Sequence, residues 1–154
     1  MNKKLVISIM IGFFVLYLNG SVKFEKVDKE TILKTSQEWQ DNYHNYTVDP
    51  SILEILKTKA EGLKIDVYLG LWCSDSRHNV PGFIKIIDSI ENPDLVVNYY
   101  AVERKPSKDV KYFIDEYNVE RVPTFIFYKN GKEIGRIIEN PKKTLYDDFL
   151  EIIF

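Results

Sequence analysis

The sequence predicts an α/β fold in which helices flank a central mixed β-sheet, preceded by an N-terminal helical extension. Three patterns lead to this prediction. Apolar and polar residues alternate over residues 63–70, as in a β-strand, and apolar residues recur at helical spacing over residues 80–90. Asn130-Gly131 separates two strand-like runs, which indicates a tight hairpin. The predicted order is helix, strand, helix, strand, helix, strand, strand, helix.

Composition limits the classes of protein to consider. A chain of 154 residues with 45% hydrophobic residues can bury the core of one domain. The net charge of -2 leaves no basic excess to recruit nucleic acid. One cysteine excludes an intramolecular disulfide. One cysteine and two histidines are also too few ligands for a structural zinc site. These counts predict no metal site. We also expect no cofactor and a monomeric protein.

The N-terminus is typical of an export signal. Met1–Lys4 supply positive charge, Leu5–Leu18 form an unbroken apolar run, and Asn19–Ser21 end it. The run is shorter than the about 20 residues of a membrane-spanning helix. We interpret residues 1–21 as a signal peptide and expect an extracytoplasmic protein, periplasmic or secreted. Because no Ala-x-Ala cleavage pattern is present, an uncleaved membrane anchor is the alternative.

Residues 22–154 are predicted to form one domain. Residues 22–62 make a helical segment packed on a core of residues 63–154. Within it we expect a short strand at Val22–Val27 and one helix from Asp28 to Tyr46. A second helix begins at Asp49-Pro50, since Asp is a favoured N-cap and Pro a favoured first helical residue.

The remaining elements follow in order. Leu95–Val102 has the character of a strand, and Ser107 can cap the next helix. Val122–Tyr128 and Glu133–Ile138 are the two strands of the hairpin. Asn140-Pro141 is predicted to open the last helix. The helix after Ser107 is identified by an apolar stripe of Val110, Phe113, Ile114 and Tyr117.

The only cysteine lies in Trp72-Cys73-Ser74-Asp75-Ser76, where the strand at residues 63–70 passes into a helix. A thiol at the first turn of a helix faces unpaired backbone N–H groups and the positive end of the helix dipole. Both favour the thiolate, which is the reactive form. Asp75 opposes this effect, and Arg77 and His78 could offset Asp75.

This arrangement resembles the thioredoxin-like family, whose motif is Trp-Cys-x-x-Cys, with Ser76 in place of the second cysteine. Pro81 lies eight residues after Cys73, where the family carries a proline that kinks the active-site helix. Val122-Pro123-Thr124, followed by Phe125–Lys132, looks like the family's cis-proline strand and hairpin. The resemblance extends from Leu63 to the C-terminus and implies a thioredoxin-like fold.

The resemblance also implies roles for individual residues. Cys73 would be the nucleophile. Independently of the resemblance, the spacing suggests the hypothesis that Ser76 donates a hydrogen bond to the Cys73 thiolate. Trp72 would cap the thiol and line a partner groove, and Pro123 would be cis, with Val122 and Thr124 flanking the groove. The expected partners are thiols and disulfides, either protein or of low molecular weight.

Two departures from the family limit the predicted chemistry. Ser76 cannot resolve a mixed disulfide, so an outside thiol must do so. Isomerisation, deglutathionylation and trapping of a partner remain. Thioredoxins also carry a buried acid six residues before the first cysteine, where this chain has Val67. The neighbouring Asp66 should face the opposite side of the strand.

Other functions stay open at this stage. The second hypothesis is a non-catalytic module that binds an extended peptide beside Pro123, with Cys73 an inert remnant. A cluster-binding protein of the glutaredoxin type is disfavoured, because those proteins have Gly after the cysteine and this chain has Ser74. A peroxidase is disfavoured by the absence of a Thr-x-x-Cys site.

Overall fold

The computed structural model describes residues 25–105, 111 and 114–154. Within these residues, a mixed sheet has the strand order β1-β3-β2-β4-β5. β2 and β3 are parallel, and every other neighbouring pair is antiparallel, which confirms the predicted mixed sheet. The strands are β1 (Glu25–Val27), β2 (Leu63–Leu69), β3 (Val96–Ala101), β4 (Thr124–Lys129) and β5 (Lys132–Ile138).

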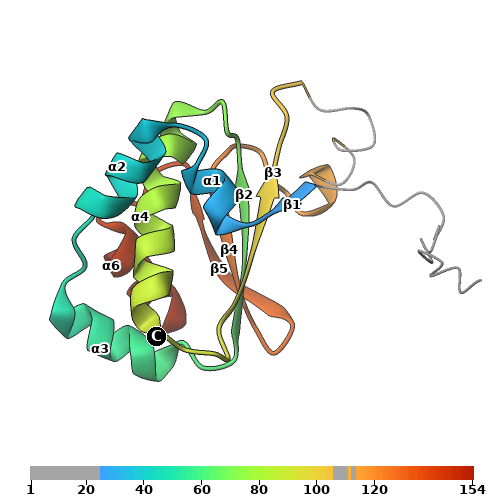
Figure 1. The fold of residues 1–154 in the computed structure, drawn as a ribbon. Helices are drawn as coiled ribbons and strands as arrows, with labels where there is room; N and C mark the ends of the chain where they lie inside the picture. Colours follow the sequence, from blue (N-terminus) through green and yellow to red (C-terminus); the bar gives the residue numbers. More distant parts are fainter. Residues whose placement is uncertain (1–24, 106–110, 112–113) are drawn as a thin grey trace, which may run out of the picture.

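Most of the helices lie on one side of the sheet, with α4 running along its length, whereas the helical residues 114–116 lie on the other side (Figure 1). The labelled helices are α1 (Lys29–Leu33), α2 (Gln37–Asn45), α3 (Pro50–Lys59), α4 (Ser74–Ile90) and α6 (Leu145–Ile153). The opposite face of the sheet packs against Ile114, Tyr117 and Val119. Most of the helix predicted after Ser107 lies outside the described residues. None of the helices in the described part of the chain is long and apolar enough to cross a bilayer.

The main core fills the space between the helices and the sheet. Phe83 of α4 meets Phe125 of β4 with ring centroids 4.6 Å apart, and Phe127 meets Phe149 of α6 at 4.9 Å. The helical segment before β2 contributes to the same cluster of buried residues, through Ile32, Trp39 and Leu56. Burial of each such side chain stabilises the fold by roughly 1.5–3 kcal/mol. The boundary predicted at residue 21 lies outside the described residues.

The single helix predicted from Asp28 to Tyr46 is wrong, because the structure has two helices there. The Lys34 N–H closes α1, and Ser36 is extended at φ -162° and ψ 167° as the N-cap of α2. The Ser36 carbonyl accepts a hydrogen bond from the Trp39 N–H at 3.1 Å. Ser36 thus occupies the N-cap position of α2 through its extended backbone, without a side-chain capping hydrogen bond.

The predicted start of the last helix is also wrong. α6 begins at Leu145, and Thr144 is its N-cap, whose hydroxyl accepts from the Asp147 N–H at 3.1 Å. The chain just before the helix is held by the buried Asp148 carboxylate, which accepts from the Lys142 N–H at 2.7 Å and the Lys143 N–H at 3.2 Å. These side-chain contacts place the helix start after Asn140-Pro141.

We expect Asp148→Ala to lower the free energy of unfolding by about 2 kcal/mol, because two backbone N–H groups lose their acceptor. Urea denaturation would measure the loss. Glu151→Ala on the same helix is the matched control, since exposed Glu151 only pairs with Lys143 at 3.5 Å and should matter little. Equal stability of Asp148→Ala and the wild type would contradict the role given to Asp148.

Candidate active site

Cys73 stands at the junction between β2 and α4, as the sequence predicts. It is the N-cap of α4, with extended backbone angles of φ -90° and ψ 131°. Its N–H donates to the Gly70 carbonyl at 2.9 Å, and its carbonyl accepts from the Arg77 N–H at 3.0 Å. The turn therefore holds a partly buried thiol at the end of the sheet, beside the first turn of a helix of 17 residues.

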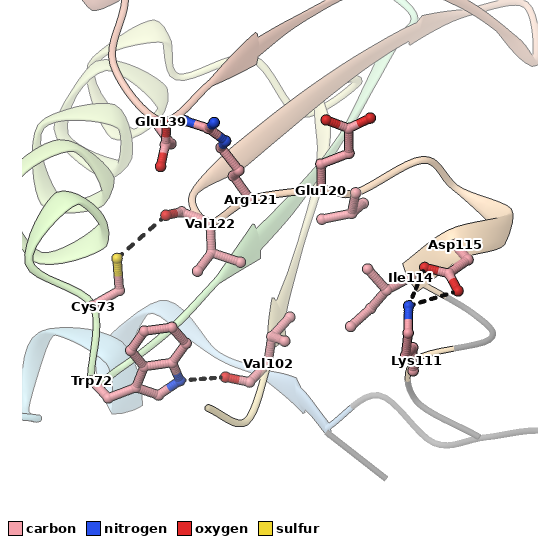
Figure 2. Close-up of a pocket in the computed structure, with 11 residues that line it drawn as sticks. Trp72, Cys73, Val102, Lys111, Ile114, Asp115, Glu120, Arg121, Val122 and Glu139 are labelled. Carbon is pink, nitrogen blue, oxygen red and sulfur yellow. Dashed lines mark hydrogen bonds and ion pairs between the residues drawn. The ribbon is translucent and has the colours of Figure 1, made fainter. Parts of the chain in front are cut away.

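The Cys73 thiol donates to the carbonyl oxygen of Val122 at 3.3 Å (Figure 2). The peptide bond between Val122 and Pro123 is cis, as predicted. Pro123 and Thr124 are buried behind this contact, and the Thr124 hydroxyl donates to the Arg121 carbonyl at 2.6 Å. The fold thus brings Cys73 and Val122 together from positions 49 residues apart. The hydrogen bond from Thr124 to Arg121 stabilises the loop that carries Val122.

A cavity of about 670 Å³ opens beside the thiol. Its apolar lining extends away from Cys73, between the end of β3 and the loop before β4 (Figure 2). The apolar lining residues are Trp72, Val102, Ile114, Val119 and Val122. Val102, Ile114 and Val119 were not predicted as site residues. A usable signal was the position of Val102 at the carboxyl end of a strand beside β2, where open sheets bind ligands.

Charged residues form the rim of this cavity. Lys111 pairs with Asp115 at 3.0 Å, and Arg121 pairs with Glu139 at 2.7 Å. The hydrogen bond to Glu139 raises the pKa of the Arg121 guanidinium. Glu120 also lines the cavity and is exposed. The cavity therefore has an apolar floor and a rim that carries charges of both signs.

Trp72 is not a core residue, since 47% of it is exposed. Its indole N–H donates to the Val102 carbonyl at 2.9 Å, and the Arg104 guanidinium lies 5.5 Å from the ring centroid. The ring also lies close to Gly70, where an added Cβ would come within 2.9 Å of it. These contacts fix the orientation of the exposed Trp72 ring next to the thiol.

Ser76 has a different contact from the predicted one. It is fully buried, and its hydroxyl oxygen accepts from the Gly70 N–H at 3.1 Å. The predicted donation to Cys73 is not among the hydrogen bonds of the described residues. Ser76 therefore ties the first turn of α4 to the end of β2, a contact that links residues six positions apart.

The structure places the charges predicted around Cys73 as follows. Arg77 pairs with Glu38 of α2 at 3.2 Å, and its carbonyl accepts from Asn42. His78 is exposed and lines a second cavity of about 440 Å³ between α2 and α6. Arg77 is thus engaged with α2, and offsetting of Asp75 by Arg77 or His78 stays a prediction.

The carboxyl group next to the family's buried-acid position faces away from the thiol. Val67 is fully buried in the main core. Asp66 is buried on the opposite face, where it accepts from Asn98 at 2.7 Å and from Lys64 at 2.8 Å. Asp66 is thus engaged on the far side of the sheet, as its place in the strand predicts. Among the described residues, no group of three His, Cys, Asp or Glu side chains could hold a metal ion.

Pro81 lies within α4, where the sequence places the proline of the active-site helix. It is buried, as are its neighbours Val80 and Gly82. Gly82 faces Tyr46 so closely that an added Cβ would come within 2.5 Å of its ring. This part of α4 is therefore packed against the chain that follows α2.

Comparisons with known proteins agree with this arrangement. Thioredoxin H5 of Oryza sativa subsp. japonica is 28% identical over 85 residues, which span 55% of this chain and 58% of the rice protein. Thioredoxin-like protein R548 of Acanthamoeba polyphaga mimivirus is 25% identical over 123 residues, 74% of this chain and 86% of the viral protein.

A crystal structure of a Pseudomonas aeruginosa protein of unknown function has the same fold. Its TM-score is 0.58 at 13% identity, over 79% of this chain and 76% of that one. This likeness speaks to the fold alone. The sequence model described as Thioredoxin matches residues 22–146. That range covers both the thiol-bearing turn and the cis-proline loop, and the chain belongs to the thioredoxin family.

Proposed function

We propose that this protein is an exported thiol–disulfide exchange protein that acts through Cys73 alone. The observation that carries the proposal is the position of the Cys73 sulfur. It lies at the start of a helix, 3.3 Å from the Val122 carbonyl, and on the wall of an apolar cavity. A thiol in this position can meet the disulfide of an extended chain that lies along Val122, in the manner of strand addition.

The proposed reaction has two exchange steps. The Cys73 thiolate attacks one sulfur of a substrate disulfide, forms a mixed disulfide, and expels the other sulfur as a thiolate. A thiolate from outside the chain then attacks the substrate sulfur of the mixed disulfide and releases Cys73 as a thiolate. One S–S bond breaks and one forms in each step, and solvent takes up and returns the thiol proton. With a thiol of the same substrate in the second step, the result is isomerisation.

The surroundings of Cys73 support a polypeptide substrate. The hydrogen bond from the Trp72 indole to the Val102 carbonyl fixes the orientation of the ring, so the ring presents an apolar face beside the sulfur. The cavity continues past Val122 toward Val119 and Ile114, which gives room for an apolar side chain of the partner. Burial of such a side chain adds binding free energy that a small disulfide lacks.

Export is part of the proposal and has its own support in the sequence. Residues 1–21 combine a positive start with an apolar run, and an oxidising compartment supplies disulfides. Fractionation of the native cell, with mass spectrometry of the mature chain, tests it. A chain that begins near Val22 outside the cytoplasm is the expected result. Recovery of the intact chain in the cytoplasm would overturn export.

The exchange activity is tested by trapping partners in the native cell. Thiols are quenched with acid, and tagged protein is separated on non-reducing gels and identified by mass spectrometry. Because Ser76 cannot release a partner, we expect adducts joined through Cys73 that disappear on reduction. Absence of adducts, with Cys73 free and open to alkylation, would contradict the proposal.

A non-catalytic binding module is the second candidate. It is favoured by the serine at position 76 and by buried Val67, since both replace groups that serve catalysis in the family. The cavity beside Cys73 would then bind an extended peptide without any exchange of disulfide bonds. Replacement of Cys73 separates the two candidates, because only exchange requires the sulfur.

A further inference from the structure

Glu139, which follows β5, joins the loop before β4 to the helix that carries Cys73. Its backbone is left-handed, with φ 57°. Its N–H donates to the Pro123 carbonyl at 2.7 Å, and its own carbonyl accepts from the Asn79 side chain at 3.0 Å. Asn79 belongs to α4, is 5% exposed, and donates a second hydrogen bond to the Asn140 side chain at 2.9 Å.

These contacts form a closed series that includes the Cys73 thiol. Cys73 and Asn79 lie on one helix, six residues apart, so their separation is fixed. Asn79 holds the main chain of Glu139, Glu139 holds Pro123, and the adjoining Val122 carbonyl accepts from the Cys73 thiol. Figure 2 shows Glu139 beside Arg121 and Val122, where it also lines the cavity. The series uses main-chain atoms of Glu139, and its side chain separately binds Arg121.

We propose that Asn79 is a positioning residue for thiol–disulfide exchange. By holding Glu139, it sets the distance between the Cys73 sulfur and the backbone at Val122, along which a substrate chain must lie. The role rests on the proposed function, because the distance matters only when a bound disulfide has to reach the sulfur. A buried amide that donates to two oxygens is well suited to fix a loop, since each bond loses strength steeply with poor geometry.

The test compares two reactions of Cys73 in the full-length protein. The first is exchange with a peptide that carries a mixed disulfide in an extended segment. The second is alkylation by iodoacetamide, which needs no bound chain. In Asn79→Ala we expect peptide exchange to slow by about tenfold, because a small misplacement of reacting groups is costly. We expect alkylation to be unchanged. A purely structural weakening would not separate the two rates.

Asn140→Ala is the matched control, because it removes the second acceptor of Asn79 and leaves the bond to Glu139. It should exchange at the wild-type rate. If Asn79→Ala does not fold, Asn79→Leu keeps a similar volume and cannot donate, so the same loss is expected. Equal exchange by the Asn79 variant and the wild type, or an equal fall in both reactions, overturns the role of Asn79. No exchange by the wild type overturns the proposed function as well.

Discussion

Cys73→Ser is expected to slow exchange with a disulfide peptide by at least about 1,000-fold, the scale of loss when a reacting nucleophile is removed. Serine has nearly the same shape as cysteine, but its hydroxyl does not form disulfides. The fold should persist, because the site is partly buried and a serine hydroxyl can also donate to the Val122 carbonyl, as the thiol does. Formation of the mixed disulfide, followed by mass spectrometry at timed intervals, measures the rate.

The same variant distinguishes exchange from simple binding. Affinity for a disulfide-free peptide of the same sequence should be equal in the wild type and Cys73→Ser, since the groove is lined by other residues such as Trp72 and Val102. Wild-type rates in the serine variant would rule out Cys73 as the nucleophile. A wild-type protein that binds the peptide but forms no adduct would establish the binding module instead.

Ser76→Cys is expected to convert a protein that holds its partner into one that releases it. Side chains at the N-cap and three residues later lie next to each other at a helix start, as in a capping box. The new thiol could therefore attack the mixed disulfide at Cys73. Intramolecular attack in good geometry should shorten the lifetime of the adduct by at least about 100-fold. Its decay without added thiol, followed on non-reducing gels, provides the measurement.

The substitution has a cost that the structure makes explicit. The Ser76 oxygen accepts from the Gly70 N–H, and sulfur is a weak acceptor, so Ser76→Cys should lose about 1 kcal/mol of stability. Ser74→Cys is the matched control, because it adds a thiol to the same turn at an exposed position next to Cys73. Adducts that last equally long in Ser76→Cys and in the wild type would show that the two side chains do not meet.

Local patterns allowed most of the sheet to be predicted. Alternation located β2, and Asn130-Gly131 predicted the hairpin, where both residues have positive φ, 53° and 75°. Asp49-Pro50 predicted the start of α3, with Asp49 bonded to the Ser51 N–H. These features depend on neighbours in the chain, and so the sequence alone contains the information.

The two errors in the helices have a common cause. Ile32 and Trp39 are seven residues apart and both buried, so the apolar period continues across the break between α1 and α2. The break lies at Ser36, where the backbone is extended, and apolar periodicity does not register such a change of backbone conformation. Before α6, Pro141 would be an acceptable first helical residue. The helix starts later because Thr144 caps it and the Asp148 carboxylate accepts hydrogen bonds from the Lys142 and Lys143 N–H groups.

The candidate site divides in the same way. The motif around Cys73 and the cis bond at Val122-Pro123 were predicted, since each is local and resembles a known family. The acceptor role of Ser76 and the bond from Asn79 to Glu139 were not, because Gly70 and Glu139 come close only in the folded chain. Such contacts join side chains to backbone atoms, for which sequence patterns carry little signal.

The serine that faces Gly70 in place of a second sulfur also has a thermodynamic consequence. A chain with one thiol has no internal disulfide, so a folded molecule cannot store a pair of electrons and has no two-electron midpoint potential of its own. The direction in which it works must then be set by the ratio of thiols to disulfides around it. Under the proposed mechanism, the protein would rearrange disulfides where free thiols are abundant and would stay joined to its partners where free thiols are scarce. The fraction of the protein that is joined to a partner would then depend on the compartment.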